Sequence, residues 1–193
     1  MIRRAVVWML VFGVAGVPTA QAIVLDGAIV WQDGAGRFVM LDGQTGFAVG
    51  FDTFDDDNLY AFDEDQNIVL PADVRVDIAS QPSGGSTEGV LAKGTIVASH
   101  YVFFDSLNGT QQGWIDFDAP VLGIAAYQDT MAATDFLANT QVRYISPDLR
   151  GLEDGDFVWI DENKPNRIWV SWAGSSPGDY IRVFTERSPA AMM

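Results

Sequence analysis

Carboxylate side chains are concentrated in one short stretch of the chain, between residues 52 and 65. The stretch contains Asp52, Asp55, Asp56, Asp57, Asp63, Glu64 and Asp65. Calcium binds to proteins through several oxygen ligands, and an acidic loop can supply them. We therefore predict a calcium site with Asp55, Asp57, Asp63 and Asp65 as its ligands. The alternative interpretation is an acidic loop that only contacts solvent.

The spacing within this stretch does not match an EF-hand. Asp63, Asp65 and Asn67 occupy the first three ligand positions of such a loop. Ile68 stands where the motif needs glycine, and Val74 stands where it needs the bidentate acid. Calcium would therefore have to bind here in another geometry.

Two tryptophans lie among polar residues at the alternating spacing of a β-strand. Trp114 shares one strand face with Asp116 and Asp118, because side chains two residues apart point the same way. Trp169 likewise has polar neighbours on its own face and apolar residues on the opposite one. Sugar rings stack on exposed indoles, so we predict that Trp114, Asp116, Asp118 and Trp169 bind an extracellular glycan. The alternative is that both tryptophans cover a sheet edge or pack beneath a helix.

Catalytic side chains are harder to identify. An enzyme needs a base, a nucleophile or paired carboxylates in a cleft. His100 is the only histidine and lies within an apolar run, so we expect it to be buried and hydrogen-bonded. The sequence also predicts no strand-to-helix elbow of the Gly-x-Ser-x-Gly type that would supply a nucleophilic serine. Asp116 and Asp118 would lie about 7 Å apart, which permits glycosidase chemistry, but such pairs are common on surfaces. We therefore expect no catalytic residues.

The composition argues against nucleic acid and anionic membranes as partners. The 193 residues include 26 acidic and 11 basic side chains, a formal net charge of −15. Such a surface repels phosphate groups but is compatible with divalent cations and neutral glycans. The chain has no cysteine, which excludes thiol catalysis, disulfide redox chemistry and cysteine-ligated zinc.

Residues 1–22 have the pattern of a secretory signal peptide. Two arginines precede an apolar run over residues 5–17, and Ala20-Gln21-Ala22 matches the small-x-small cleavage pattern. Glycine and proline interrupt the run before the roughly 20 apolar residues that a membrane span needs. We therefore expect cleavage after Ala22, secretion to the periplasm or the medium, and no membrane association after cleavage.

The elements that must position these side chains are short strands separated by turn residues. Alternating or apolar runs predict strands at 23–31, 37–41, 67–78, 95–104, 113–127, 142–145, 156–160, 167–172 and 179–185. Residues 129–138 predict one short helix, and the Ser- and Gly-rich residues 81–89 predict a mobile loop. We expect one all-β domain over residues 23–189, a jelly-roll-like sandwich of two antiparallel sheets, followed by a disordered end at 190–193.

Several runs of the sequence resemble a group of secreted bacterial proteins. They are FDDDNLYAFDEDQNI at 54–68, VASHYVFFD at 97–105, WIDFD at 114–118, RGLE at 150–153 and SPGDYIRV at 176–183. Over about residues 50–187 the chain is similar to the ectodomain of proteins that carry a PEP-CTERM sorting tail. This resemblance implies association with exopolysaccharide and biofilm matrix, through motifs that are structural rather than catalytic. Residues 190–193 do not match the sorting tail, so free secretion is equally expected.

Taken together, the sequence predicts a secreted, non-enzymatic β-sandwich that acts in the extracellular matrix or in surface recognition. The first alternative is a calcium-assisted carbohydrate-binding module, with calcium as cofactor and an extracellular glycan as ligand. The second alternative, a glycoside hydrolase, is disfavoured because the chain lacks a convincing catalytic set.

Overall fold

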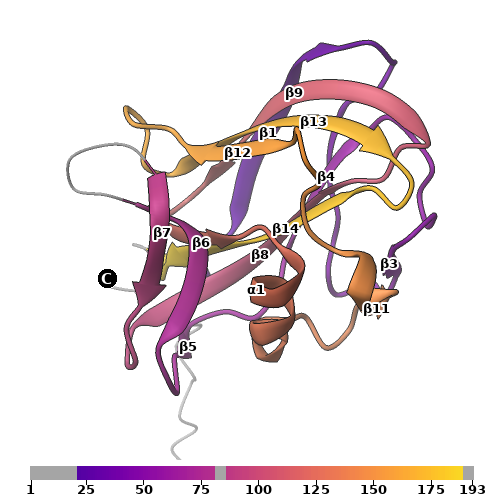
Figure 1. The fold of residues 1–193 in the computed structure, drawn as a ribbon. Coiled ribbons are helices and arrows are strands. Elements are labelled where there is room, and N and C mark those ends of the chain that lie inside the picture. The colour runs from indigo at the N-terminus through magenta and orange to yellow at the C-terminus, as the bar shows by residue number, and fades with distance from the viewer. Residues whose placement is uncertain (1–20, 81–85, 189–193) are drawn as a thin grey trace, which may run out of the picture.

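The computed structural model describes residues 21–80 and 86–188, which form two packed β-sheets (Figure 1). Three segments expected from the sequence lie wholly or partly outside the described residues: residues 1–20 of the signal peptide, residues 81–85 of the mobile loop and the disordered end at 190–193. The described chain enters the sandwich at Ala22, which is buried in a cluster with Ala98 and Ala119. No helix among the described residues is both long and apolar enough to span a membrane.

One layer of the sandwich is a four-stranded antiparallel sheet. Its strands, in spatial order, are β1 (Val24–Gln32), β9 (Asn108–Phe117), β13 (Arg167–Ser175) and β12 (Phe157–Ile160). The β9–β13 pairing is the longest of the sheet and runs from Arg167 opposite Asp116 to Ser175 opposite Asn108. In Figure 1 this layer lies above β8 and β14 of the second sheet.

The second layer is an eight-stranded sheet. Seven of its strands, in spatial order, are β2 (Phe38–Met40), β4 (Leu59–Asp63), β8 (Ile96–Phe104), β14 (Asp179–Glu186), β10 (Val121–Ala125), β6 (Val74–Ser80) and β7 (Ser86–Leu91). The eighth, β5 (Ile68–Val69), pairs with β8. A small additional sheet joins β3 (Ala48–Gly50) to β11 (Arg143–Ile145).

The predicted all-β sandwich with one short helix is confirmed. The sheets are mainly antiparallel, and the exceptions among the described strands are the parallel pairs β2–β4 and β3–β11. The helix α1 spans Gln128–Ala133 and is followed by the 3-10 turns η1 (Asp135–Leu137) and η2 (Pro147–Leu149). It is therefore shorter than the predicted 129–138.

Two apolar cores lie on opposite faces of the eight-stranded sheet. Ile181 and Val183 of β14 point toward the four-stranded sheet and pack in the same cluster as Ile115. Tyr180 and Phe184 alternate with them and pack on the other face, beneath α1, η1 and the small sheet. β8 is thus a central strand, covered on both sides and buried along nearly its whole length.

Two expectations about the strands are corrected. Residues 86–89 of the predicted mobile loop belong to β7, where Gly89 lies so close to β6 that a Cβ would come within 2.5 Å of Cβ of Ala79. The small residues there permit close strand packing. The predicted strand 113–127 is divided at residues 118–120, where the chain leaves the four-stranded sheet and enters the eight-stranded one as β10.

Candidate functional site

The outer side of the four-stranded sheet carries a row of tryptophans. Trp114 of β9 lies directly opposite Trp169 of β13, and Trp169 lies directly opposite Trp159 of β12. Their neighbours Ile168 and Val170 are fully buried between the sheets, so alternation along the strand turns the tryptophans outward. The sequence predicted this direction for Trp114 and Trp169, and the structure brings the two together.

Further exposed aromatic side chains border this row. Trp31 of β1 and Phe157 of β12 lie in the next row of the sheet, and they are 52% and 62% exposed. Trp159 is 39% exposed. We call the outward side chains of Trp31, Trp114, Phe157, Trp159 and Trp169 the aromatic face. Its members on β12 were missed in the sequence, although Phe157 and Trp159 alternate with buried residues in the pattern that exposes them.

A shallow hollow lies at the β12 end of the aromatic face. Trp159 and Trp169 are near-parallel, with planes 10° apart and ring centroids 6.2 Å apart. Nε1 of Trp169 donates a hydrogen bond of 2.8 Å to Asp161, which fixes the indole orientation. The hollow has a volume of about 560 Å³. Besides the two indoles, the turn residues Asp161, Glu162 and Asn163 and the apolar Ile78, Val158 and Ile160 line it. It therefore combines apolar ring surface with a polar rim.

An ionic cluster lies in the row of the sheet next to Trp114 and Trp169, near the β12–β13 turn. Asp116 accepts hydrogen bonds from Nε and Nη2 of Arg167, at 2.6 and 2.8 Å, and from Nζ of Lys164. Burial alone would raise the pKa of Asp116, but the hydrogen bonds from these two cations outweigh it and hold that pKa below its ordinary value. The Arg167 guanidinium also lies 3.8 Å from the ring centroid of Trp114. Trp114 is therefore partly covered, while Trp159 and Trp169 border the hollow.

Asp118 does not belong to this face. It lies beyond the end of β9, and its Oδ1 accepts a 3.0 Å hydrogen bond from the backbone N–H of Ile23. The structure thus brings together Trp114, Asp116 and Trp169 of the predicted glycan-binding residues and places Asp118 elsewhere.

The acidic stretch does not converge on the predicted set of four ligands. Among the described residues, the carboxylates close enough to hold one cation are Asp52, Asp55 and Asp105, within 4.8 Å of one another. Burial, followed by the charges of Asp52 and Asp105, raises the pKa of Asp55. Asp105 was missed because it follows β8, some 50 residues away in the sequence. It already accepts hydrogen bonds from the backbone of Thr53 and Phe54.

The other predicted calcium ligands make separate structural contacts. Asp57 accepts hydrogen bonds from Ser106 and from the backbone of Ala35. Asp63 ends β4 and accepts a hydrogen bond from the backbone of Val24. Asp65 lies in the segment that follows β4. Burial and the neighbouring Glu64 raise the pKa of Asp65. Of the four, only Asp55 belongs to the carboxylate group.

His100 is fully buried and hydrogen-bonded at both ring nitrogens. Nδ1 lies 2.7 Å from Oδ1 of Asp63, and Nε2 lies 3.0 Å from Oγ1 of Thr185. This arrangement has the order of a catalytic triad, acid–imidazole–hydroxyl. The Thr185 side chain, however, is itself fully buried. The structure thus places His100 in the hydrogen-bonded core role that the sequence suggested.

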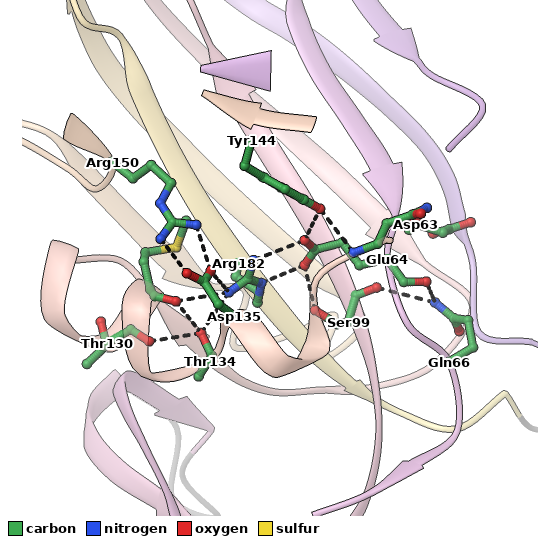
Figure 2. A network of polar contacts seen from close by, with 12 residues as sticks. Asp63, Glu64, Gln66, Ser99, Thr130, Thr134, Asp135, Tyr144, Arg150 and Arg182 are labelled. Atoms are coloured by element: carbon green, nitrogen blue, oxygen red, sulfur yellow. Dashed lines mark hydrogen bonds and ion pairs between the residues drawn. The ribbon is translucent and has the colours of Figure 1, made fainter. Parts of the chain in front are cut away.

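A second buried polar group lies beneath α1 (Figure 2). Glu64 accepts hydrogen bonds from Ser99, Tyr144 and Arg182. Arg182 also donates to Oδ1 of Asp135 at 3.2 Å, and Figure 2 shows its guanidinium lying between the two acids. Burial works against the charge of Arg182, but Glu64 outweighs it and raises the pKa of Arg182 above its ordinary value.

Arg150 completes this polar group. Its Nη1 and Nη2 donate to the two carboxylate oxygens of Asp135, at 2.7 and 2.8 Å. Two arginines and two acids therefore balance each other and join β14 to the end of β4, η1 and the chain after η2. We interpret this group as a structural connection between those elements.

Comparison with known proteins adds no assignment. No family model matches the chain, and neither the curated proteins nor the solved structures that were searched contain a match.

Proposed function

We propose that this protein is a secreted, non-enzymatic β-sandwich that acts by surface recognition, and that its aromatic face binds an extracellular glycan. The single observation that carries the proposal is the row of Trp114, Trp169 and Trp159 across three neighbouring strands, with a hollow beside the last two. Flat, partly exposed indoles match the C–H faces of sugar rings. The polar rim of the hollow supplies partners for hydroxyl groups.

The degree of exposure supports a binding role for this face. Trp31, Phe157 and Trp159 expose large aromatic side chains on one side of one sheet. Contiguous exposed apolar surface is unfavourable in water, and on a folded protein it commonly marks an interaction site. Tryptophan is also among the residues that contribute most to binding energy at recognition surfaces.

Charge favours an uncharged ligand over an anionic one. The chain carries a net charge of −15, and Asp161 and Glu162 line the hollow. Nucleic acids and acidic polysaccharides would be repelled, whereas neutral glycans would not. This supports neutral glycans as the class of ligand.

The chemistry of the candidate catalytic groups supports a non-enzymatic role. Asp116 is held ionised by Arg167 and Lys164, so it is poorly suited to donate a proton to a leaving group. The hydroxyl of Thr185, which His100 contacts, is buried away from any substrate. Neither arrangement offers the exposed acid–base pair that hydrolysis requires.

The proposal is tested by screening the protein, as it is secreted, against a glycan array. We expect wild type to bind at least one neutral glycan, and Trp159→Ala and Trp169→Ala to weaken that binding at least tenfold. The control is Phe136→Ala, because Phe136 is 46% exposed in η1, away from the aromatic face. If no glycan binds, or if both tryptophan variants bind as wild type does, the proposal is wrong.

A further inference from the structure

Asp179 is a buried acid at the interface between the two sheets. It begins β14 and is 2% exposed, and it alternates with Tyr180 so that its side chain points the same way as Ile181, toward the four-stranded sheet. Its Oδ2 is buried, and among the described residues no N–H or O–H group donates a hydrogen bond to it. A carboxylate oxygen in that position would be strongly destabilised.

Asp156 supplies the polar group beside it. Asp156 directly precedes β12, and its Oδ1 accepts a 2.7 Å hydrogen bond from the N–H of Ala173 in β13. Its Oδ2 accepts one of 3.3 Å from the N–H of Glu153. Backbone donors of the four-stranded layer therefore stabilise Asp156 as a carboxylate, and its negative charge lies close enough to Asp179 to raise the pKa of that carboxyl.

We propose that Asp156 and Asp179 share one proton, so that a protonated Asp179 donates a hydrogen bond to the Asp156 carboxylate and links the two sheets. Two neighbouring carboxylates, of which Asp179 is buried, cannot both ionise without an electrostatic penalty. Asp156 has two backbone donors, whereas the buried Oδ2 of Asp179 has none among the described residues, so the proton resides on Asp179. This link is independent of glycan binding on the outer face.

The charged surroundings agree with this assignment. The groups that act on Asp179 are Asp156 and Glu153, both from the segment before β12 and both acidic. Burial, and then these two acids, raise the pKa of Asp179 to about 9. A divalent cation would need about six oxygen ligands, whereas both oxygens of Asp156 are already engaged by N–H groups.

The link makes stability depend on pH in a defined direction. The carboxyl is protonated in the folded protein up to about pH 9, whereas in the unfolded chain it ionises near its ordinary value of 3.8. The unfolded state therefore binds fewer protons across that interval, and stability from this group falls as pH rises from about 4 to about 9. Alkaline conditions loosen the contact between the two sheets.

The test is urea unfolding of wild type and Asp179→Asn between pH 5 and pH 9. Asparagine donates the same hydrogen bond without a titrating proton. We expect the unfolding midpoint of the variant to exceed that of wild type at pH 8 and to depend less steeply on pH. Asp154→Asn is the matched control, since Asp154 is an exposed acid of the same turn, and it should keep the wild-type slope. Equal slopes in Asp179→Asn and wild type would overturn the proposal.

Two further measurements keep the proposal testable if the variant does not fold. The carboxyl carbon of Asp179 in wild type can be titrated by NMR, and we expect it to remain protonated at pH 7. An ionised signal at that pH overturns the shared proton. The second measurement is the melting temperature in calcium chloride and in EDTA. If a proton makes the link, neither should change the melting temperature of wild type. A shift that is present in wild type and absent from Asp179→Asn would assign the site to a cation instead.

Discussion

Arg182 and Glu64 form an ion pair in which neither side chain has any exposed surface. Nε of Arg182 lies 2.6 Å from Oε2 of Glu64, and Nη2 lies 3.1 Å from Oε1. Removing both charges from water is costly, and only their mutual attraction and additional hydrogen bonds offset that cost. Here the additional bonds come from Ser99, Tyr144 and the backbone of Met131. The pair therefore connects elements that are far apart in the sequence.

Loss of one member of this pair should be strongly destabilising. Arg182→Met leaves Glu64 buried without its counterion, and we expect a loss of about 3–5 kcal/mol in the free energy of unfolding. Urea titration measures it. Arg75→Met is the matched control because Arg75 is largely exposed in its ion pairs with Glu88 and Asp129, and it should cost less than about 1 kcal/mol. Equal losses in the two variants would contradict a structural role for the buried pair.

Gln111 offers the opposite case, a buried polar group whose removal should stabilise the protein. It is 1% exposed, and neither atom of its carboxamide has a hydrogen-bond partner among the described residues. Gln111→Met keeps the length of the side chain and removes both polar atoms, so we expect a gain of about 1–2 kcal/mol in the free energy of unfolding.

The neighbouring residue provides the control for this gain. Gln112 points outward, and its Nε2 donates to Ser171. Gln112→Met should therefore change stability by less than about 0.5 kcal/mol. A loss of stability in Gln111→Met would contradict this prediction, because it would show that the Gln111 carboxamide makes hydrogen bonds in solution.

Acid should weaken the fold through Asp116 and Asp135. For both, burial would raise the pKa, but hydrogen bonds from arginine outweigh it, so each pKa lies below its ordinary value of 3.8. The stabilisation is present above that value and is lost as pH falls through the lower, folded-state pKa. Urea midpoints should drop as pH falls below about 4, and Arg167→Met should reduce this drop. An unchanged acid dependence in that variant would exclude Asp116 as a contributor.

Local patterns predicted much of this fold because they are set by near neighbours in the sequence. Alternation identified the outward direction of Trp114 and Trp169, and an apolar run identified the buried strand β8. The same reasoning failed between residues 59 and 63. Flanking acids suggested a loop there, although the apolar run Leu59–Phe62 forms the buried part of β4.

Contacts between distant segments could not be predicted in this way. The position of Trp159 beside Trp169 depends on the register of the β12–β13 hairpin, and the pairing of Arg150 with Asp135 depends on how η1 packs. Asp105 meets Asp55 only because the end of β8 lies near that loop. One chain carries no local signal for such register and packing, so sequence reasoning could not group Asp105 with Asp52 and Asp55.

The last prediction separates a binding role for the tryptophans from a structural one. If Trp159 serves recognition, its partial exposure on the edge strand β12 means that Trp159→Ala should cost only about 1 kcal/mol of stability, the value of its ring contact with Trp169. Trp172 points between the sheets and is fully buried, so Trp172→Ala should cost about 3–5 kcal/mol. Urea unfolding of both variants measures the difference. A cost for Trp159→Ala close to that for Trp172→Ala would favour the alternative in which the tryptophans only cover the sheet.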